Sequence, residues 1–314
     1  MTSVLTPATA TTDDSPAPQP GAAQGLDRTE IRRRRRRQAR LRRLPLEVLL
    51  YAVMVAVIVI MSVPVIWMLL ASLKTPAEIY AVPLAWVPEV FDLSNYGEVA
   101  TAIPIARMFF NSVLITTVGA GLKVLLGLAC AYALVFVDVP LRKTAFVLVL
   151  FALLIPGQIT IIPNYTLIAN LGWLNTYQGI IVPGLASAFG TFLFRQYFLG
   201  LPVSVLEAAQ LDGAGHYRRL WRFVVPMSVP TIAAVSLVSI VGEWNEYLWP
   251  MLVVDNPSTM PLPVGLTLLQ RVEGMQNWGV LMAATTLVTL PILVIFLILQ
   301  RRLVAGLTAG AVTG

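Results

Sequence analysis

The chain has 314 residues, of which 57% are hydrophobic and only 12% are charged, against roughly half and a quarter in an ordinary soluble domain. These proportions exclude a soluble globular domain. The net charge of +6 lies entirely in residues 1–43, which hold ten of the 22 Lys and Arg residues but four of the 16 Asp and Glu residues. The single cysteine, Cys130, excludes a disulfide framework within the chain and a cysteine-cluster metal site.

Residues 1–45 are expected to form a disordered, basic tail. Residues 1–26 are rich in Ala, Pro, Thr, Ser and Gln and have too little apolar surface to offset the entropy of ordering. The run IRRRRRRQARLRR at 31–43 is typical either of a nucleic-acid or nuclear-address segment or of the cytoplasmic flank of a membrane span. A long apolar segment comes directly after it, which favours the membrane flank and no nucleic acid. Residues 46–314 then form the transmembrane domain.

Six apolar runs are long enough to cross a hydrocarbon layer of about 30 Å as helices. The first is too long for the apolar part of a cleaved signal, which has ~7 to 15 residues, so we interpret it as an anchor. The runs are apolar on all sides, unlike the alternating strands of a membrane barrel. The predicted fold is therefore an all-α integral membrane protein with six transmembrane helices, at residues 46–70, 113–137, 144–168, 179–198, 229–248 and 280–299.

Basic residues near the span ends predict the orientation, because Lys and Arg are retained on the cytoplasmic side. With the N-terminus inside, the outer segments carry only Lys74, Arg107 and Arg271. The inner segments carry the tail arginines together with Arg142, Lys143, Arg195, Arg218, Arg219, Arg222, Arg301 and Arg302. We therefore expect both termini in the cytoplasm and the chain in a bacterial inner (plasma) membrane.

The predicted cytoplasmic loop at 200–227 has the pattern of a helix, a turn and a second helix. Ser204 and Glu207 have the S-x-x-E spacing of a capping box, which predicts the start of a first short helix. Asp212 and Gly213 form a turn pair, in which Gly adopts a positive φ and Asp caps the second helix. This second helix is expected over 215–225, with a basic face of the kind that contacts lipid headgroups.

This loop resembles the EAA motif of binding-protein-dependent ABC importers, whose pattern is E-A-A-x-x-D-G-A with a P further along the chain. The matching residues are Glu207, Ala208, Ala209, Asp212, Gly213, Ala214 and Pro226. The resemblance implies a type I importer permease fold in which the short helix enters a cleft of the ATP-hydrolysing subunit. We expect the two alanines to permit close docking, the turn at Gly213 to set the angle, and Glu207 to meet a basic partner.

Further segments resemble the smaller permease of carbohydrate-type importers, and most of all the actinobacterial glycerol-3-phosphate and glycerophosphodiester permeases. The resemblance implies four kinds of partner: a second permease, two copies of an ATPase, an extracytoplasmic binding protein and the lipid bilayer. It also implies that residues 255–277 contact the binding protein and residues 306–314 the ATPase. The segments are SLKTPAEIY at 72–80, TFLFRQYF at 191–198, EWNEYLWP at 243–250, PLPVGLTLLQRVEGMQNWG at 261–279 and RRLVAGLTAGAVTG at 301–314.

A candidate translocation pathway lies near the outer end of the fifth run, at Glu243, Trp244, Asn245, Glu246 and Tyr247. These side chains suit hydroxyls or a cationic choline head, which aromatic rings hold by cation–π attraction. The alternative is an interfacial aromatic belt. The acids disfavour a bare phosphate unless a basic residue such as Lys123 compensates. The expected solute is thus of the sn-glycerol-3-phosphate and glycerophosphodiester class, in particular a glycerophosphodiester such as glycerophosphocholine, with a di- or oligosaccharide of the maltose or trehalose type as the alternative.

Two other function classes are less consistent with the sequence. An ion-coupled secondary transporter needs an ionisable residue near the membrane centre, and Lys123, Glu243 and Glu246 are candidates, but an EAA loop has no role in such a carrier. A membrane enzyme is not favoured, because His216 is the only histidine and no nucleophile–base set accompanies it. The chain also has no G-x-x-x-x-G-K-[ST] loop. It is therefore expected to be non-catalytic and without a cofactor, and ATP and Mg²⁺ are expected on the ATPase.

Overall fold

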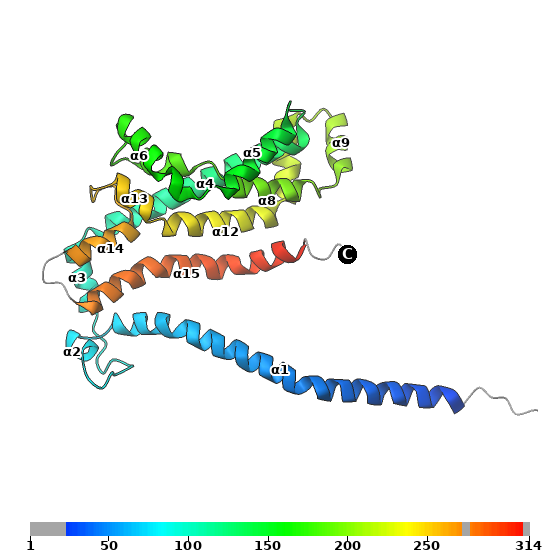
Figure 1. The fold of residues 1–314 in the computed structure, drawn as a ribbon, viewed down its shortest axis with the longest axis horizontal. Coiled ribbons are helices and arrows are strands. Elements are labelled where there is room, and N and C mark those ends of the chain that lie inside the picture. Colours follow the sequence, from blue (N-terminus) through cyan, green and yellow to red (C-terminus); the bar gives the residue numbers. More distant parts are fainter. Residues whose placement is uncertain (1–22, 272–276, 310–314) are drawn as a thin grey trace, which may run out of the picture. The chain divides into compact units, whose positions relative to one another are not determined.

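A computed structural model describes residues 23–271 and 277–309, with side chains described for 47–269 and 277–298. Every regular element in this part of the chain is a helix (Figure 1). The chain divides into two units, residues 1–65 and 66–314. The all-α prediction is confirmed over the described residues.

Helix α1 (Ala23–Ala71) contains the first predicted span, and its segment Glu47–Ala71 is long and apolar enough to cross a membrane. It differs from the expected disordered tail, because residues 23–45 are helical, while residues 1–22 lie outside the described residues. Residues 26–44 contain neither Gly nor Pro, and their Arg, Leu, Gln and Ala are strong helix formers.

The segment after α1 folds around a buried lysine. Lys74, which the orientation places in an outer segment, has no exposed surface; its Nζ donates to the carbonyl of Ala85 and lies 4.5 Å from the ring centroid of Trp67. Asn95 Nδ2 donates to the Lys74 carbonyl at 2.9 Å. The segment holds the short α2 (Pro76–Ile79), which starts with a capping box of Thr75 and Glu78, and α3 (Ser94–Ala102).

The centre of the second unit is α4 (Ile105–Phe136), which packs along α8 (Ala188–Phe198) and α12 (Val229–Asn245). Figure 1 shows these three helices side by side. A Cβ on Gly127 would lie 3.2 Å from the backbone nitrogen of Thr191, so this glycine lets α4 and α8 approach closely. The last helix, α15 (Trp278–Ala309), packs on α12.

The structure has three bent pairs of helices, two of them within predicted spans. Helix α5 (Arg142–Leu154) meets η1 (Gly157–Thr160) and α6 (Ile161–Asn170) at 93°. Ile155 is extended, as expected of a residue that precedes a proline. Helix α7 (Tyr177–Ile181) and η2 (Val182–Gly184) meet α8 at 45°.

The third bend, of 84°, lies between His216–Met227 and α12. Helix α12 ends at Asn245 and is followed by α13 (Leu248–Val253) and α14 (Leu262–Arg271). By length and composition, the described residues contain three continuous helices able to cross a membrane, or up to six if each bent pair is one span. Membrane helices are thus supported, and the predicted apolar runs at 144–168 and 179–198 are each formed by a bent pair of helices.

Candidate functional site

The first helix of the EAA loop is α9 (Val203–Leu211), and it begins differently from the prediction. Its N-cap is Pro202, which makes no side-chain cap. Proline pre-sets a φ suited to a helix start, so the helix begins before Ser204 and the predicted capping box of Ser204 and Glu207 is wrong. Glu207 then lies in the middle of the helix, with its side chain exposed.

The end of α9 is a Schellman turn, in which orphan carbonyls of the last turn accept backbone N–H groups of the residues just beyond the helix. The N–H of Gly213 donates to Gln210 O at 3.0 Å, and the N–H of Ala214 donates to Ala209 O at 2.9 Å. Gly213 has a φ of +76°, so the predicted positive φ is confirmed. Asp212 is the C-cap of α9 and does not cap the next helix, whose N-cap is Gly215.

The two alanines of the motif differ in burial. Ala209 is buried, as are Leu206 and Ala214, and Leu206 packs in a cluster with Phe194 and Phe198 of α8. Ala208 is exposed, together with Glu207 and Leu211, of which Leu211 is 89% exposed. Ala209 therefore packs within this chain, and Ala208 is the alanine on the outer surface of α9.

An arginine ties the second helix of the loop to the first. This helix consists of α10 (His216–Arg219), the π-helical η3 (Leu220–Val224) and α11 (Val225–Met227). Arg219 Nη1 donates to Gln210 Oε1 at 2.8 Å, and its Nη2 donates to His216 Nδ1 at 3.0 Å. Two arginines of the predicted basic face, Arg218 and Arg222, are exposed. The third, Arg219, is partly buried and lines a pocket of about 200 Å³.

Pro226 lies in α11, just before the 84° bend at Ser228. A hydrogen bond connects the bend to α8: Tyr197 Oη donates to the carbonyl of Met227 at 2.7 Å. Pro226 lacks a backbone N–H. The motif therefore extends from the exposed face of α9 to the entry of α12.

The predicted pathway residues lie where α12 ends, and they separate into three kinds. Trp244 is buried; its Nε1 donates to Val288 O at 3.0 Å, so it packs against α15 and is no interfacial belt residue. Asn245, Glu246 and Tyr247 are exposed at the break before α13, and Glu246 Oε1 accepts the N–H of Trp249 at 3.3 Å.

The remaining residue, Glu243, forms an ion pair between its Oε1 and Lys123 Nζ of α4. The side chains of Lys123 and Glu243 are 24% and 11% exposed. A Cβ on Gly119 would lie 2.9 Å from Glu243 Oε2, and one on Gly184 would lie 3.5 Å from Lys123 Nζ. The pair thus occupies space that two glycines leave open.

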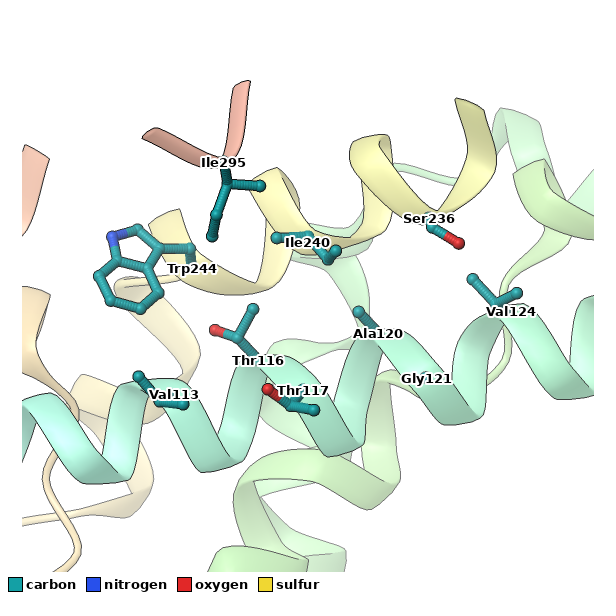
Figure 2. A pocket seen from close by; sticks show the side chains of 10 residues that line it. All are labelled: Val113, Thr116, Thr117, Ala120, Gly121, Val124, Ser236, Ile240, Trp244 and Ile295. Carbon is teal, nitrogen blue, oxygen red and sulfur yellow. The ribbon is translucent and has the colours of Figure 1, made fainter. Parts of the chain in front are cut away.

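A pocket of about 270 Å³ lies between α4, α12 and α15 (Figure 2). Thr116, Ala120 and Val124 of α4 face Ile240 and Ser236 of α12 across it. Thr116 Oγ1 is buried and has no hydrogen-bond partner among the described residues. The sequence analysis missed Thr116, Thr117 and Ser236, although hydroxyls inside an apolar run were the available signal.

No group of three or more His, Cys, Asp or Glu side chains suited to a metal comes together in the part of the chain that the structure describes. The polar groups that the fold brings together inside the helix bundle are the Lys123–Glu243 pair and the hydroxyls of Thr116, Thr117 and Ser236 at the pocket.

The profile of the family described as "Binding-protein-dependent transport system inner membrane component" matches residues 123–309. The chain belongs to this family. The matched permease region includes the whole EAA loop and Lys123. An inner membrane location and a binding-protein partner follow from membership, and the resemblance drawn from the motifs is confirmed.

Three relatives illustrate the family. The arabinooligosaccharides transport system permease protein AraQ of Halalkalibacterium halodurans is 33% identical over 80% of this chain and 91% of its own length. The sn-glycerol-3-phosphate transport system permease proteins UgpE of Yersinia enterocolitica and Brucella suis are 32% and 30% identical, over 83% and 82% of this chain and 96% and 94% of theirs. These relatives are non-catalytic subunits, and so is this permease.

The fold of this permease matches a solved structure. A crystal structure of a bacterial ABC transporter that imports the acidic polysaccharide alginate superposes with a TM-score of 0.71 and 23% identity, over 81% of this chain and 95% of that one. The type I importer permease fold is supported by this likeness.

Proposed function

We propose that this permease is one of two membrane subunits of an ATP-driven importer and that α9 docks into a cleft of the ATPase. In the proposal, the chain crosses the membrane six times with both termini in the cytoplasm. The observation that carries it is the exposed surface of Glu207, Ala208 and Leu211 on a helix whose end is held by the turn at Gly213. ATP and Mg²⁺ bind to the ATPase dimer, not to this chain.

The test is co-purification of the ATPase with the permease. Changing Ala208 to Trp places a large side chain on the docking surface and is expected to abolish co-purification, because close helix packing requires small residues there. The matched control is Leu199 to Ala, an exposed change at the end of α8 that lies outside α9. Full retention of the ATPase by the Ala208→Trp complex would reject the docking surface.

We further propose that the solute is a glycerophosphodiester such as glycerophosphocholine. The UgpE relatives are named as sn-glycerol-3-phosphate permeases and support a solute with a glycerol phosphate group. The mixed charges of Lys123, Glu243 and Glu246 near the exposed Tyr247 favour a solute that also carries a cationic head. The AraQ relative supports the second candidate, a di- or oligosaccharide.

Calorimetry of the cognate binding protein distinguishes these two solutes. Binding of glycerophosphocholine, together with its uptake into vesicles that contain the whole transporter, supports the first. Tight binding of a sugar with no heat from glycerophosphocholine supports the second and leaves the docking proposal intact.

A further inference from the structure

The ion pair of Lys123 and Glu243 joins two helices at one depth. Lys123 lies 13 residues from Phe136, the end of α4 nearest to the EAA loop, and Glu243 lies 14 residues from Val229, the corresponding end of α12. At 1.5 Å per residue both charges are roughly 20 Å from that end. Ionisable side chains at this depth within a membrane are costly to bury and are usually functional.

Interrupted helices surround the pair. Gly184, which approaches Lys123 Nζ, ends η2 at the break before α8, and Glu243 precedes the break at Glu246 by less than one helical turn. In transporters, broken helices at membrane depth are tolerated where they line a cavity, and solute sites lie there. Glu243, Glu246 and Thr116 line one small pocket at this place.

The pair remains accessible, since the Lys123 side chain keeps 24% of its surface exposed. Among residues with described side chains, Lys123 is the only Lys or Arg near the middle of a span-length helix. An ammonium group presents three N–H donors and no fixed geometry. It can therefore pair with a phosphate oxygen as readily as with a carboxylate.

We propose that Lys123 and Glu243 form an exchangeable ion pair, in which the phosphate of the solute replaces the Glu243 carboxylate on Lys123 Nζ. This inference rests on the proposed function and specifies which residue recognises the solute. In the empty transporter, Glu243 prevents an unpaired ammonium in a low dielectric. When the phosphate pairs with Lys123, the released Glu243 carboxylate pairs with the cationic head of the same solute.

The exchange preserves charge balance only for a zwitterionic solute. With glycerophosphocholine, each of the four charges has an opposite partner. A phosphomonoester such as glycerol-3-phosphate has no cationic head, so Glu243 stays unpaired and like charges repel. The pair thus makes the permease selective for a phosphodiester with a cationic head over a phosphomonoester.

The test measures equilibrium binding of labelled glycerophosphocholine and glycerol-3-phosphate to the purified whole transporter without its binding protein. The complexes carry Glu243→Gln, Lys123→Met or both changes, with Glu89→Gln as the control for loss of one exposed acid. Glu243→Gln frees Lys123, so glycerol-3-phosphate is expected to bind at least about tenfold more tightly than to the wild type. Lys123→Met and the double variant are both expected to lose binding of glycerophosphocholine and of glycerol-3-phosphate to the same extent.

A purely structural ion pair predicts a different pattern, because removing either partner leaves a buried charge unpaired and removing both does not. Equal loss of thermal stability in both single variants, with recovery in the double variant and no tightening in Glu243→Gln, would overturn the exchange.

The proposed solute is tested separately by the wild type. If the wild-type transporter and its binding protein both ignore glycerophosphocholine, the solute assignment fails. In that case, the binding of inorganic phosphate to the same complexes is measured instead. Tighter phosphate binding by Glu243→Gln than by the wild type would still support the exchange, and equal binding would reject it.

Discussion

The backbone N–H of Ala214 donates a hydrogen bond to the carbonyl oxygen of Ala209 at 2.9 Å and closes the Schellman turn at the end of α9. Both alanines are buried, so the turn is held by packing as well as by the hydrogen bond. The residue between them that makes this geometry accessible is Gly213, at a φ of +76°. The geometry of the turn sets where the exposed face of α9 points relative to the next helix.

Changing Gly213 to Val is expected to uncouple ATP hydrolysis from uptake or to lower the yield of the complex. A β-branched residue at positive φ costs about 1–2 kcal/mol, and relaxing it reorients α9. Uptake per ATP hydrolysed in vesicles is the measurement. Gly215 to Ala is the matched control, since Gly215 has a φ of −67° and open space around it. Wild-type coupling in Gly213→Val would contradict this account.

Arg219 is expected to matter for coupling in a way that Arg218 does not. Arg219→Met removes the hydrogen bond to Gln210, which holds α10 against α9, and the one to His216 within α10; each contributes about 1 kcal/mol. Arg218→Met removes an exposed charge from the same helix. The expected result is a several-fold lower ratio of uptake to hydrolysis for Arg219→Met alone. Equal effects of the two substitutions would indicate that only the positive charge matters.

Asn111 is expected to hold the segment between α13 and α14 in place. Its fully buried Nδ2 donates to the carbonyls of Ser258 and Met260, and its Oδ1 accepts from Tyr177 Oη. Asn111→Ala leaves Met260 O and Tyr177 Oη without this partner, at roughly 1–3 kcal/mol per buried group, whereas Ser258 O keeps a hydrogen bond from Arg107 Nε at 3.1 Å. The midpoint of thermal unfolding should fall, and binding-protein docking should weaken if this segment is the contact surface.

Tyr177→Phe provides the graded comparison, because it leaves only Asn111 Oδ1 unpaired. Its loss of stability is expected to be about half of that in Asn111→Ala, since one group is left unpaired where two are left unpaired in the other variant. A larger loss in Tyr177→Phe than in Asn111→Ala would show that the Asn111 contacts are not the source of the effect.

Two glycine substitutions are expected to differ although both sites are crowded. A Cβ on Gly179 would collide with the backbone carbonyl oxygen of Trp173, whereas one on Gly265 would meet the thioether of Met108. A backbone atom cannot move aside, but a flexible Met side chain can. Gly179→Ala should therefore lower stability by about 1–3 kcal/mol and Gly265→Ala by less, as measured by thermal unfolding of the purified complex. The reverse order would contradict this explanation.

The sequence by itself determined the features that depend on composition and local stereochemistry. Long apolar runs can only be satisfied as helices in a membrane, and a turn that needs positive φ selects glycine. The membrane class, the helical fold and the geometry at Gly213 were therefore predictable, and the motif at 207–214 led to the family.

Only the tertiary structure decided which side chains meet. Lys123 and Glu243 are 120 residues apart in the chain, and their pairing depends on how α4 packs on α12. Ala208 and Ala209 are identical in chemistry, yet packing buries one and exposes the other. Trp244 likewise became a core residue because its indole N–H reaches a carbonyl of α15. Local preferences act over a few residues, whereas these contacts depend on the packing of helices distant in sequence.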